Sequence, residues 1–438
     1  MIYLRHTTTI LLFALAIAGC RQKEKLQLSN TDILHQNQNQ LTEVIIYDVF
    51  TPPVASRLYV YTSLAAYEAI RFKKEGNPSI TARLKGFGEM PVPQKEKTYD
   101  FTLAATKAFF SVTRDVKVFS VDSLTSYEQS VYANFKDKLD ETTYSRSIAF
   151  GDSVAKVILQ RAGKDGYFAS RGKTKYLGSN IPGKWKPTPP DYLDGVEWCW
   201  NTMKPMVMDS ASLFRPSPPP TYSLDTKSTF RKGLTEVYNI NKSLTKEQKE
   251  IARYWDDNPF VIEHSGHMMF GNKKITPAGH WMGICAIASK LSGADEVKTA
   301  KAYAYTALAL YEGFISCWDE KYRSSYIRPV TAVNELFDPA WLPWLQTPPF
   351  PEYTSGHSVI SASSAMVLSS LFGENFAFQD TSDLKYIGMQ RHFNSFNEAA
   401  AEVSVSRIYG GIHYRFTADT SAAQGKKLGR YIIAKLGQ

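Results

Sequence analysis

The chain has few cysteines, no lysine-rich run, no internal repeat, and no long apolar run beyond its first twenty residues. Its four cysteines, Cys20, Cys199, Cys285 and Cys317, lie too far apart for a zinc site or a disulfide framework. We expect those after Cys20 to be buried thiols that pack as small hydrophobic groups. Without further apolar runs the rest of the chain has no candidate membrane-spanning helix, so the mature protein should be soluble.

The 438 residues carry a net charge of +9 without any basic stripe. A nucleic-acid-binding protein would gather its cations in one run or on one face, so this pattern favours a local site for a small anion and no nucleic acid. Hydrophobic residues make up 43% of the chain and aromatic residues 13%, which supports a large packed core and argues against disorder.

The N-terminus reads as an export signal. Arg5 and His6 precede the apolar run "ILLFALAIAG", which ends at Cys20 and is too short to span a membrane. The sequence "IAGC" resembles a bacterial lipobox, in which the signal is cleaved before the cysteine and the cysteine is lipidated. Residues 21–40 read as a polar tether. We therefore expect an exported protein on the periplasmic or outer-membrane side of a Gram-negative-like bacterium, touching the membrane only through a lipid on Cys20.

Helical signals dominate the remaining chain, so we predict an all-α helical bundle. The segment 178–222 is rich in Pro, Gly and Trp, and predicts a long irregular crossover between an N-terminal helical region at 41–177 and a catalytic helical core at 223–438. Thr245 and Gln248 can form a capping box. Helices are expected at 41–72 (split at Pro52-Pro53), 99–115, 123–163, 295–320, 358–372, about 397–409, and from near Thr417 to the C-terminus.

Three short segments carry the chemistry: "KYRSSYIRPV" (321–330), "YTSGHS" (353–358) and "SRIYGGIH" (406–413). In the second, Ser355 and Gly356 precede a predicted helix, so their N–H groups should lie at its positive end, where an anion binds. His357 could then transfer a proton near neutral pH. Taken alone, the same residues could be an ordinary helix cap followed by an incidental histidine.

The other two segments supply cations and a second histidine. Arg407 offers a planar fork suited to tetrahedral oxyanions, and His413 could be a nucleophile or a metal ligand. Lys321 and Arg328 would add a point charge and a second fork. Separately, each of these is better explained as a surface charge, a packed histidine or a helix-end cation. Together the three segments favour a site for a trigonal-bipyramidal oxyanion, whose equatorial oxygens fixed donors would meet.

The three segments resemble the signature of the superfamily that joins type 2 phosphatidic acid phosphatases and vanadium-dependent haloperoxidases. The matching residues, in order and spacing, are Lys321, Arg328-Pro329, Ser355-Gly356-His357, Ser406-Arg407 and His413. The surrounding "CWDEKY", "TPPFPEYTSGHS", "EIARYWDD" and "AGHW" resemble the haloperoxidase branch in particular. The likeness covers most of the mature chain and is strongest from about 245 to 416.

The resemblance implies a role for each matching residue. His413 would bind the vanadium of a vanadate cofactor, or accept a phosphoryl group if the protein were a phosphatase, because vanadate and phosphate can occupy the same site. His357 would be the acid/base group, and Lys321 would polarise bound hydrogen peroxide before a halide attacks it to give hypohalous acid for a small organic acceptor. The equatorial oxygens would be held by Lys321, Arg328, Ser355, Gly356 and Arg407.

Trp318 and Phe350 stand where the family flanks its halide region. A histidine at the Phe350 position is associated with bromoperoxidases, whereas phenylalanine resembles the fungal chloroperoxidase. Both rings are also explained as ordinary aromatic core.

The sequence departs from the family pattern at Thr417, where an aspartate often follows the ligand histidine. If that aspartate orients the ring of His413, Asp419 or a backbone carbonyl must replace it here, while Thr417 can cap the last helix. Asp256 and Asp257 are candidates for the acidic partner of Arg407. Arg323 has no match in the motif and is read as a surface or supporting charge.

The leading hypothesis is therefore a vanadate-dependent haloperoxidase. A soluble acid phosphatase with a phosphohistidine at His413 is the second, and a lipoprotein that binds an oxyanion without turnover is the third. The sequence indicates no oligomeric state.

Overall fold

The computed structural model describes residues 29–116, 118–259, 261–265, 267–271 and 273–437. The expected signal segment and Cys20 lie outside these residues. Within them the chain forms fifteen α-helices and two separate two-stranded antiparallel sheets, which confirms the predicted all-α class. In the described part of the chain, no helix is both long and apolar enough to cross a membrane. Cys199, Cys285 and Cys317 are buried free thiols, as expected.

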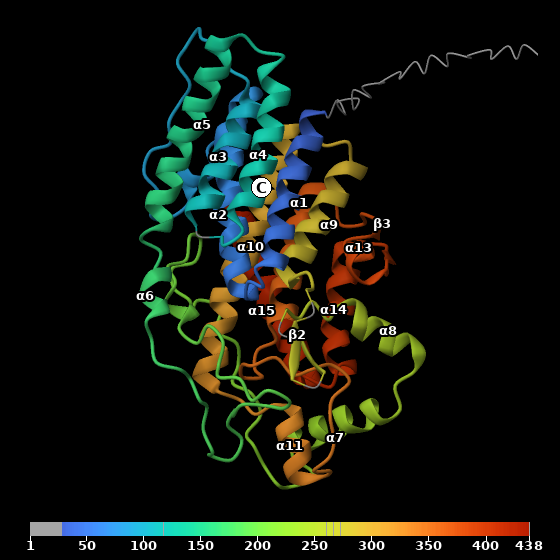
Figure 1. Ribbon diagram of the computed structural model, residues 1–438. Helices are drawn as coiled ribbons and strands as arrows, with labels where there is room; N and C mark the ends of the chain where they lie inside the picture. Colours follow the sequence, from blue (N-terminus) through green and yellow to red (C-terminus); the bar gives the residue numbers. More distant parts are fainter. Residues whose placement is uncertain (1–28, 117, 260, 266, 272, 438) are drawn as a thin grey trace, which may run out of the picture.

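The N-terminal helices gather at one end of the molecule, and α7 (Thr229–Lys242) and α11 (Pro329–Leu336) lie at the other (Figure 1). The long helix α10 (Glu296–Ser324) packs against α2 (Pro52–Ile70) from the first group and against α12 (Gly356–Phe372) from the C-terminal core, so it joins the two halves. The first group consists of α1 (Asn30–Tyr47), α2 (Pro52–Ile70), α3 (Phe101–Asp115), α4 (Val121–Lys136), α5 (Glu141–Ala162) and the short α6 (Tyr167–Arg171).

The expected polar tether is wrong over residues 30–40, because they form the first part of α1. Ser29 caps this helix, and Ile33 and Leu34 are buried although polar residues surround them in the sequence. The polar side chains in the same stretch find partners inside the protein: His35 Nδ1 lies 2.6 Å from the Tyr303 hydroxyl, and Asn37 donates to Thr106. Tertiary contacts that the local composition does not reveal thus turn a hydrophilic segment into core.

Between α6 and α7 (Thr229–Lys242) the chain is irregular apart from one 3₁₀ turn, Trp200–Thr202. This crossover is fixed to α10 (Glu296–Ser324) at two places. Buried Glu312 accepts the N–H groups of Met206 and Met208 at 2.6 and 2.8 Å. At the C-terminal end of α10, the N–H of Trp185 donates to the carbonyl of the capping residue Ser325 at 2.7 Å. The crossover therefore covers the end of α10 that carries Lys321.

The C-terminal core is built around α12, which packs against α10, α14 and α15. The predicted capping box at Thr245 and Gln248 is present and starts α8. The last helix starts at Arg415 after Tyr414, so the prediction that Thr417 caps it is wrong. The remaining elements are α8 (Lys246–Tyr254), β1 (Ile262–Ser265), β2 (Met268–Gly271), α9 (Pro277–Leu291), α11 (Pro329–Leu336), α12 (Gly356–Phe372), β3 (Phe378–Asp380), α13 (Leu384–Ile387), β4 (Arg391–Phe393), α14 (Phe396–Tyr409) and α15 (Arg415–Leu436).

Candidate active site

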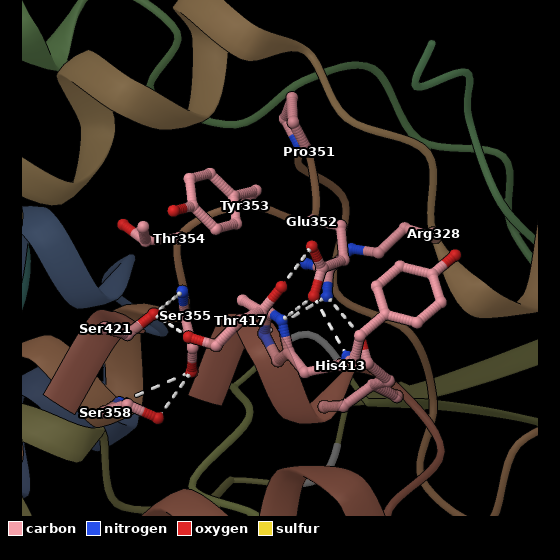
Figure 2. A network of polar contacts seen from close by, with 12 residues as sticks. Arg328, Pro351, Glu352, Tyr353, Thr354, Ser355, Ser358, His413, Thr417 and Ser421 are labelled. Atoms are coloured by element: carbon pink, nitrogen blue, oxygen red, sulfur yellow. Dashed lines mark hydrogen bonds and ion pairs between the residues drawn. The ribbon is translucent and has the colours of Figure 1, made fainter. Parts of the chain in front are cut away.

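The three predicted segments meet where α10 ends, α11 and α12 begin, and the chain turns from α14 into α15. Figure 2 shows Arg328, Glu352, Ser355 and His413 gathered at this point. The charges of Lys321, Arg328 and Arg407 all act on the His413 imidazole, so the structure brings the predicted cations to one histidine.

Lys321 and Arg328 are fully buried, and main-chain carbonyls hold both of them. Lys321 Nζ donates to the carbonyls of Pro351 and Glu352 at 2.9 and 3.1 Å, and burial lowers its pKa to about 7. Arg328 donates from Nε to the Phe350 carbonyl at 2.9 Å and from Nη1 to the Ile412 carbonyl at 2.8 Å. Its buried Nη2 has no hydrogen-bond partner among the residues that the structure describes. A guanidinium nitrogen left in this state is a donor available to a ligand.

Ser355 and Gly356 begin α12 as predicted. The Ser355 hydroxyl caps the helix by accepting from the Ser358 N–H at 3.3 Å. The Ser355 N–H, which was expected to face an anion, donates instead to the Ser421 hydroxyl at 2.9 Å. At Gly356 a side chain would meet the Trp318 ring, because a Cβ there would lie 3.2 Å from the nearest ring carbon. Glycine at this position thus lets the Trp318 ring pack directly against the start of α12.

His357 and Arg407 form the other side of the site. Arg407 Nη1 lies 3.5 Å from His357 Nε2. Burial, together with the charge of Arg407, lowers the pKa of His357 well below its usual value, so the ring is neutral and can accept a proton. Arg407 also donates to the carbonyl of Trp255, and burial lowers its pKa to about 10 against the pull of Asp256 and Asp257.

Neither candidate aspartate has a hydrogen bond or ion pair with Arg407 among the contacts described. Asp256 pairs with Lys274, and Asp257 lies 3.1 Å from His280. The acidic pair acts on Arg407 through its charge, while the direct contact is made by the main chain just before it.

His413 is oriented by Glu352, a residue that motif spacing did not reveal. The imidazole Nδ1 lies 2.8 Å from Glu352 Oε1, and Nε2 lies 3.3 Å from Arg328 Nη1. Burial lowers the pKa of His413 well below its usual value, and the nearby cations lower it further. The ring is therefore neutral, donates from Nδ1 to the carboxylate, and turns the Nε2 lone pair toward the cations.

Thr417 takes part in this arrangement, whereas Asp419 does not. The Thr417 hydroxyl donates to Glu352 Oε2 at 2.9 Å, so threonine supports the carboxylate that replaces the family's aspartate. Asp419 is exposed on α15. The available sequence signal was a glutamate three residues before Ser-Gly-His in a segment rich in proline and aromatic residues.

Trp318 and Phe350 form an apolar wall beside Lys321. Their ring centroids lie 5.1 Å apart, and Lys321 Nζ lies 4.9 Å from the Phe350 centroid. Both side chains also belong to the main hydrophobic core, so the same two rings pack in the core and line the site. Arg323 pairs with Asp319 and Glu320 and takes no part in the site, in keeping with its reading as a supporting charge.

These residues fit a bound oxyanion such as vanadate. Three buried cationic side chains act on a neutral imidazole, and one of them, Arg328, has a donor with no partner among the described residues. The fold and the site together define a helical-bundle protein with a buried cationic site, suited to an oxyanion, beside two neutral histidines.

Comparison with known proteins identifies the family. The family model of the VCPO second helical-bundle domain matches residues 301–438. A crystal structure described as the first bacterial vanadium-dependent iodoperoxidase is 42% identical, with a TM-score of 0.87 over 92% of this chain and 96% of that one. The chain belongs to the vanadium-dependent haloperoxidase family. It is a peroxidase-class enzyme with a haloperoxidase-like function, its cofactor is vanadate, and its substrates are hydrogen peroxide and halide.

More distant structures share the fold. A holo-type bacterial vanadium-dependent chloroperoxidase is 18% identical, with a TM-score of 0.69 over 89% of this chain and 93% of that one. The apo-type chloroperoxidase is 16% identical, with a TM-score of 0.66 over 88% and 94% of the two chains. A search of curated proteins gave no match.

Proposed function

We propose that this protein is a vanadate-dependent peroxidase that prefers iodide, and that His413 binds the vanadium through Nε2. The observation that carries the proposal is the orientation of the neutral His413 ring between Glu352 and Arg328. Bound vanadate supplies a Lewis-acidic centre that activates hydrogen peroxide without itself changing oxidation state.

The residues around this centre would bind the oxyanion oxygens and transfer protons. Arg328, Arg407, Ser355 and Gly356 would hold oxyanion oxygens, with the unpartnered Arg328 Nη2 as one donor. Neutral His357 would accept a proton as hydrogen peroxide binds. Lys321, whose lowered pKa lets it carry or release a proton near neutrality, would donate to a peroxide oxygen as the halide attacks.

The preference for iodide has a physical basis beside Lys321. A halide that binds beside Lys321 must lose part of its hydration shell where it contacts the rings of Trp318 and Phe350. Iodide is the least strongly hydrated of chloride, bromide and iodide. Its desolvation therefore costs the least free energy at an apolar surface that faces a cation. The 42% identical relative is named an iodoperoxidase, which supports the same choice. The hypohalous product would then halogenate a small organic acceptor.

The test compares halides on protein loaded with vanadate. Iodide oxidation by hydrogen peroxide should be fastest, bromide slower and chloride slowest in kcat/KM. Protein without vanadate and the His413→Ala variant should both be inactive, and added phosphate should compete with vanadate. Tight vanadate binding with no halide oxidation over a broad pH range would contradict the proposed function.

We also propose that the chain is an exported lipoprotein anchored through Cys20, from the lipobox-like "IAGC". Expressed with its own N-terminus in a Gram-negative host, the protein should take up labelled fatty acid and sediment with membranes. Cys20→Ser should abolish both. Equal sedimentation of the two forms would refute the anchor.

A further inference from the structure

A buried cluster that the proposed chemistry does not use lies behind the site. It consists of His280, Asp257, Asp380 and Asp383, all of them buried. His280 stands in the first turn of α9, between the segment that follows α8 and the turn that follows β3. Its Nδ1 lies 3.2 and 3.1 Å from the two carboxylate oxygens of Asp257, and its Nε2 lies 3.0 Å from Asp380 Oδ2.

His280 is held as a cation. Burial alone would lower its pKa, but the carboxylates of Asp257 and Asp380 outweigh burial and raise the pKa well above its usual value. Both ring nitrogens then donate, one to each aspartate. Asp383 lies farther away, with Oδ2 3.8 Å from Nδ1.

The set His280, Asp257 and Asp383 could in principle hold a metal ion. A zinc-like ion needs histidine and carboxylate ligands at about 2.0–2.2 Å from itself. Ligand atoms bound to one such ion would lie at separations similar to those between His280 and Asp257, so we base the assignment on the ring itself: both of its nitrogens face carboxylates, as in an imidazolium that donates from each. The observations therefore favour a hydrogen-bonded imidazolium.

The cluster reaches the active site through two consecutive carbonyl groups. The His280 ring stacks on Trp255, with centroids 4.4 Å apart and planes 24° apart. The carbonyl of Trp255 accepts from Arg407, and the backbone of Asp256 is hydrogen-bonded to His357. His357 and Arg407 are thus hydrogen-bonded to adjacent peptide groups, those of Asp256 and Trp255.

Several further hydrogen bonds hold these two peptide groups in place. The Asp257 side chain is bound to His280, and the neighbouring Tyr254 hydroxyl donates to the Asp380 carbonyl at 3.2 Å. The Trp255 indole donates to Glu402 of α14 at 2.9 Å. His280 is the one side chain of this group that contacts both Asp257 and Asp380 while stacking on Trp255.

We propose that His280 is a positioning residue for Arg407 and His357: bound between Asp257 and Asp380 and stacked on Trp255, it sets the carbonyls on which both rest. The inference rests on the proposed roles of Arg407 as an oxyanion ligand and His357 as the acid/base group. It assigns a role in the site to the cluster rather than a purely structural one.

The first test is His280→Gln, measured by vanadate affinity, thermal unfolding and the pH profile of iodide oxidation. Glutamine keeps a polar side chain but loses the ring stacking, and both of its donors leave from one nitrogen, whereas His280 reaches Asp257 and Asp380 from two. We expect the Kd for vanadate to rise about tenfold or more, as is typical when groups that orient a metal site are removed. His280→Gln also removes a positive charge that lowers the pKa of His357, so this pKa should rise and the acid limb of the profile should move to higher pH whether or not Arg407 moves. Vanadate affinity therefore carries the test of position.

Asp380→Asn separates position from charge and serves also if His280→Gln fails to fold. It keeps the size of the side chain and removes one negative charge. If the cluster acted only through its charge, vanadate would bind more tightly to Asp380→Asn than to the wild type. Because we assign it a positioning role, we expect weaker binding.

The matched control is Asp165→Asn, which breaks an equally buried pair with Arg57 (2.6 Å) in the N-terminal half. It should lower the unfolding temperature and leave vanadate affinity and the pH profile unchanged. The inference is overturned if the two cluster variants weaken vanadate binding no more than this control, or if Asp380→Asn binds more tightly. A stoichiometric metal whose removal by a chelator weakens vanadate binding would also overturn it. Failure of the wild-type protein to bind vanadate would instead refute the proposed site.

Discussion

Glu352 accepts a hydrogen bond from His413 Nδ1 at 2.8 Å, and this contact decides which nitrogen of the ring faces the cations. The same carboxylate accepts from the Tyr414 N–H at 3.2 Å and from the Thr417 hydroxyl at 2.9 Å, so it is itself fixed in place. Burial raises the pKa of Glu352 to about 7 although Arg328 and Lys321 pull it down. Burying a carboxylate is unfavourable. The hydrogen bond by which Glu352 orients the His413 imidazole explains why it is buried here.

Glu352→Gln should weaken vanadate binding about tenfold, because an amide is a poorer acceptor for Nδ1–H and for its two other donors. A purely electrostatic argument predicts the opposite, since the substitution removes a negative charge from an anion site. Equilibrium dialysis with vanadate distinguishes the two. Asp419→Asn on the exposed face of α15 should bind as the wild type does, and weakening by Asp419→Asn alone would restore the aspartate to the orienting role.

Vanadate affinity should depend on pH through Lys321. Burial lowers the pKa of this group from 10.5 to about 7, so it carries its charge below about pH 7 and loses it above. A bound oxyanion stabilises the charged form, and binding above pH 7 must therefore take up a proton. Affinity should fall as pH rises through 7, by at most about tenfold per pH unit for one proton.

The matched variant for this effect is Lys321→Gln, which keeps a donor for the Pro351 and Glu352 carbonyls but does not titrate. Any pH dependence that belongs to vanadate itself remains in the variant, so the difference between the two slopes isolates the lysine. Calorimetry in buffers of different ionisation enthalpy counts the protons. Parallel slopes for the two proteins would show that Lys321 keeps one charge state throughout.

Local signals can be predicted from the sequence because their physical cause is local. Ser355 caps α12 through a hydrogen bond three residues away, and Thr245 and Gln248 cap α8 in the same way. The cations of the three motifs were also placed together correctly, since the resemblance fixed their order and spacing. The end of α14 followed from the glycine pair before His413.

Contacts made across the fold could not be read in this way. Glu352 and His413 are 61 residues apart, and His280 and Asp380 are 100 apart. Nothing in the local pattern around a glutamate or a histidine says which distant group it will meet. The same limit explains α1, where polar residues are buried by partners on α3 and α10.

Leu34→Ala should show that α1 belongs to the core and is no tether. Leu34 is 5% exposed, and truncating a buried leucine costs roughly 2–5 kcal/mol of unfolding free energy. The neighbouring Asn39 is exposed, so Asn39→Ala should leave stability within about 0.5 kcal/mol of the wild type. Denaturant unfolding measures both. Equal stability of the two variants would support the tether instead, and vanadate affinity should be unchanged in each.

Arg328→Lys should impair the site although it keeps the charge. The guanidinium donates to the carbonyls of Phe350 and Ile412 and still has Nη2 to offer a ligand, whereas an ammonium cannot span these three positions. Leaving a buried carbonyl unpaired costs about 1–3 kcal/mol of stability. Since Ile412 precedes His413, we also expect vanadate to bind at least about tenfold more weakly.

Arg323→Lys is the matched control for this last variant. It lies in the same "KYRSSYIRPV" stretch, and its side chain is partly exposed beside Asp319 and Glu320. Lysine keeps the positive charge beside Asp319 and the buried Glu320, so stability and vanadate affinity should both stay near the wild-type values. Vanadate titration and thermal unfolding of the two variants, side by side, test whether geometry or net charge makes Arg328 a ligand. If Arg328→Lys binds vanadate as well as Arg323→Lys does, charge alone suffices and the carbonyl contacts are incidental.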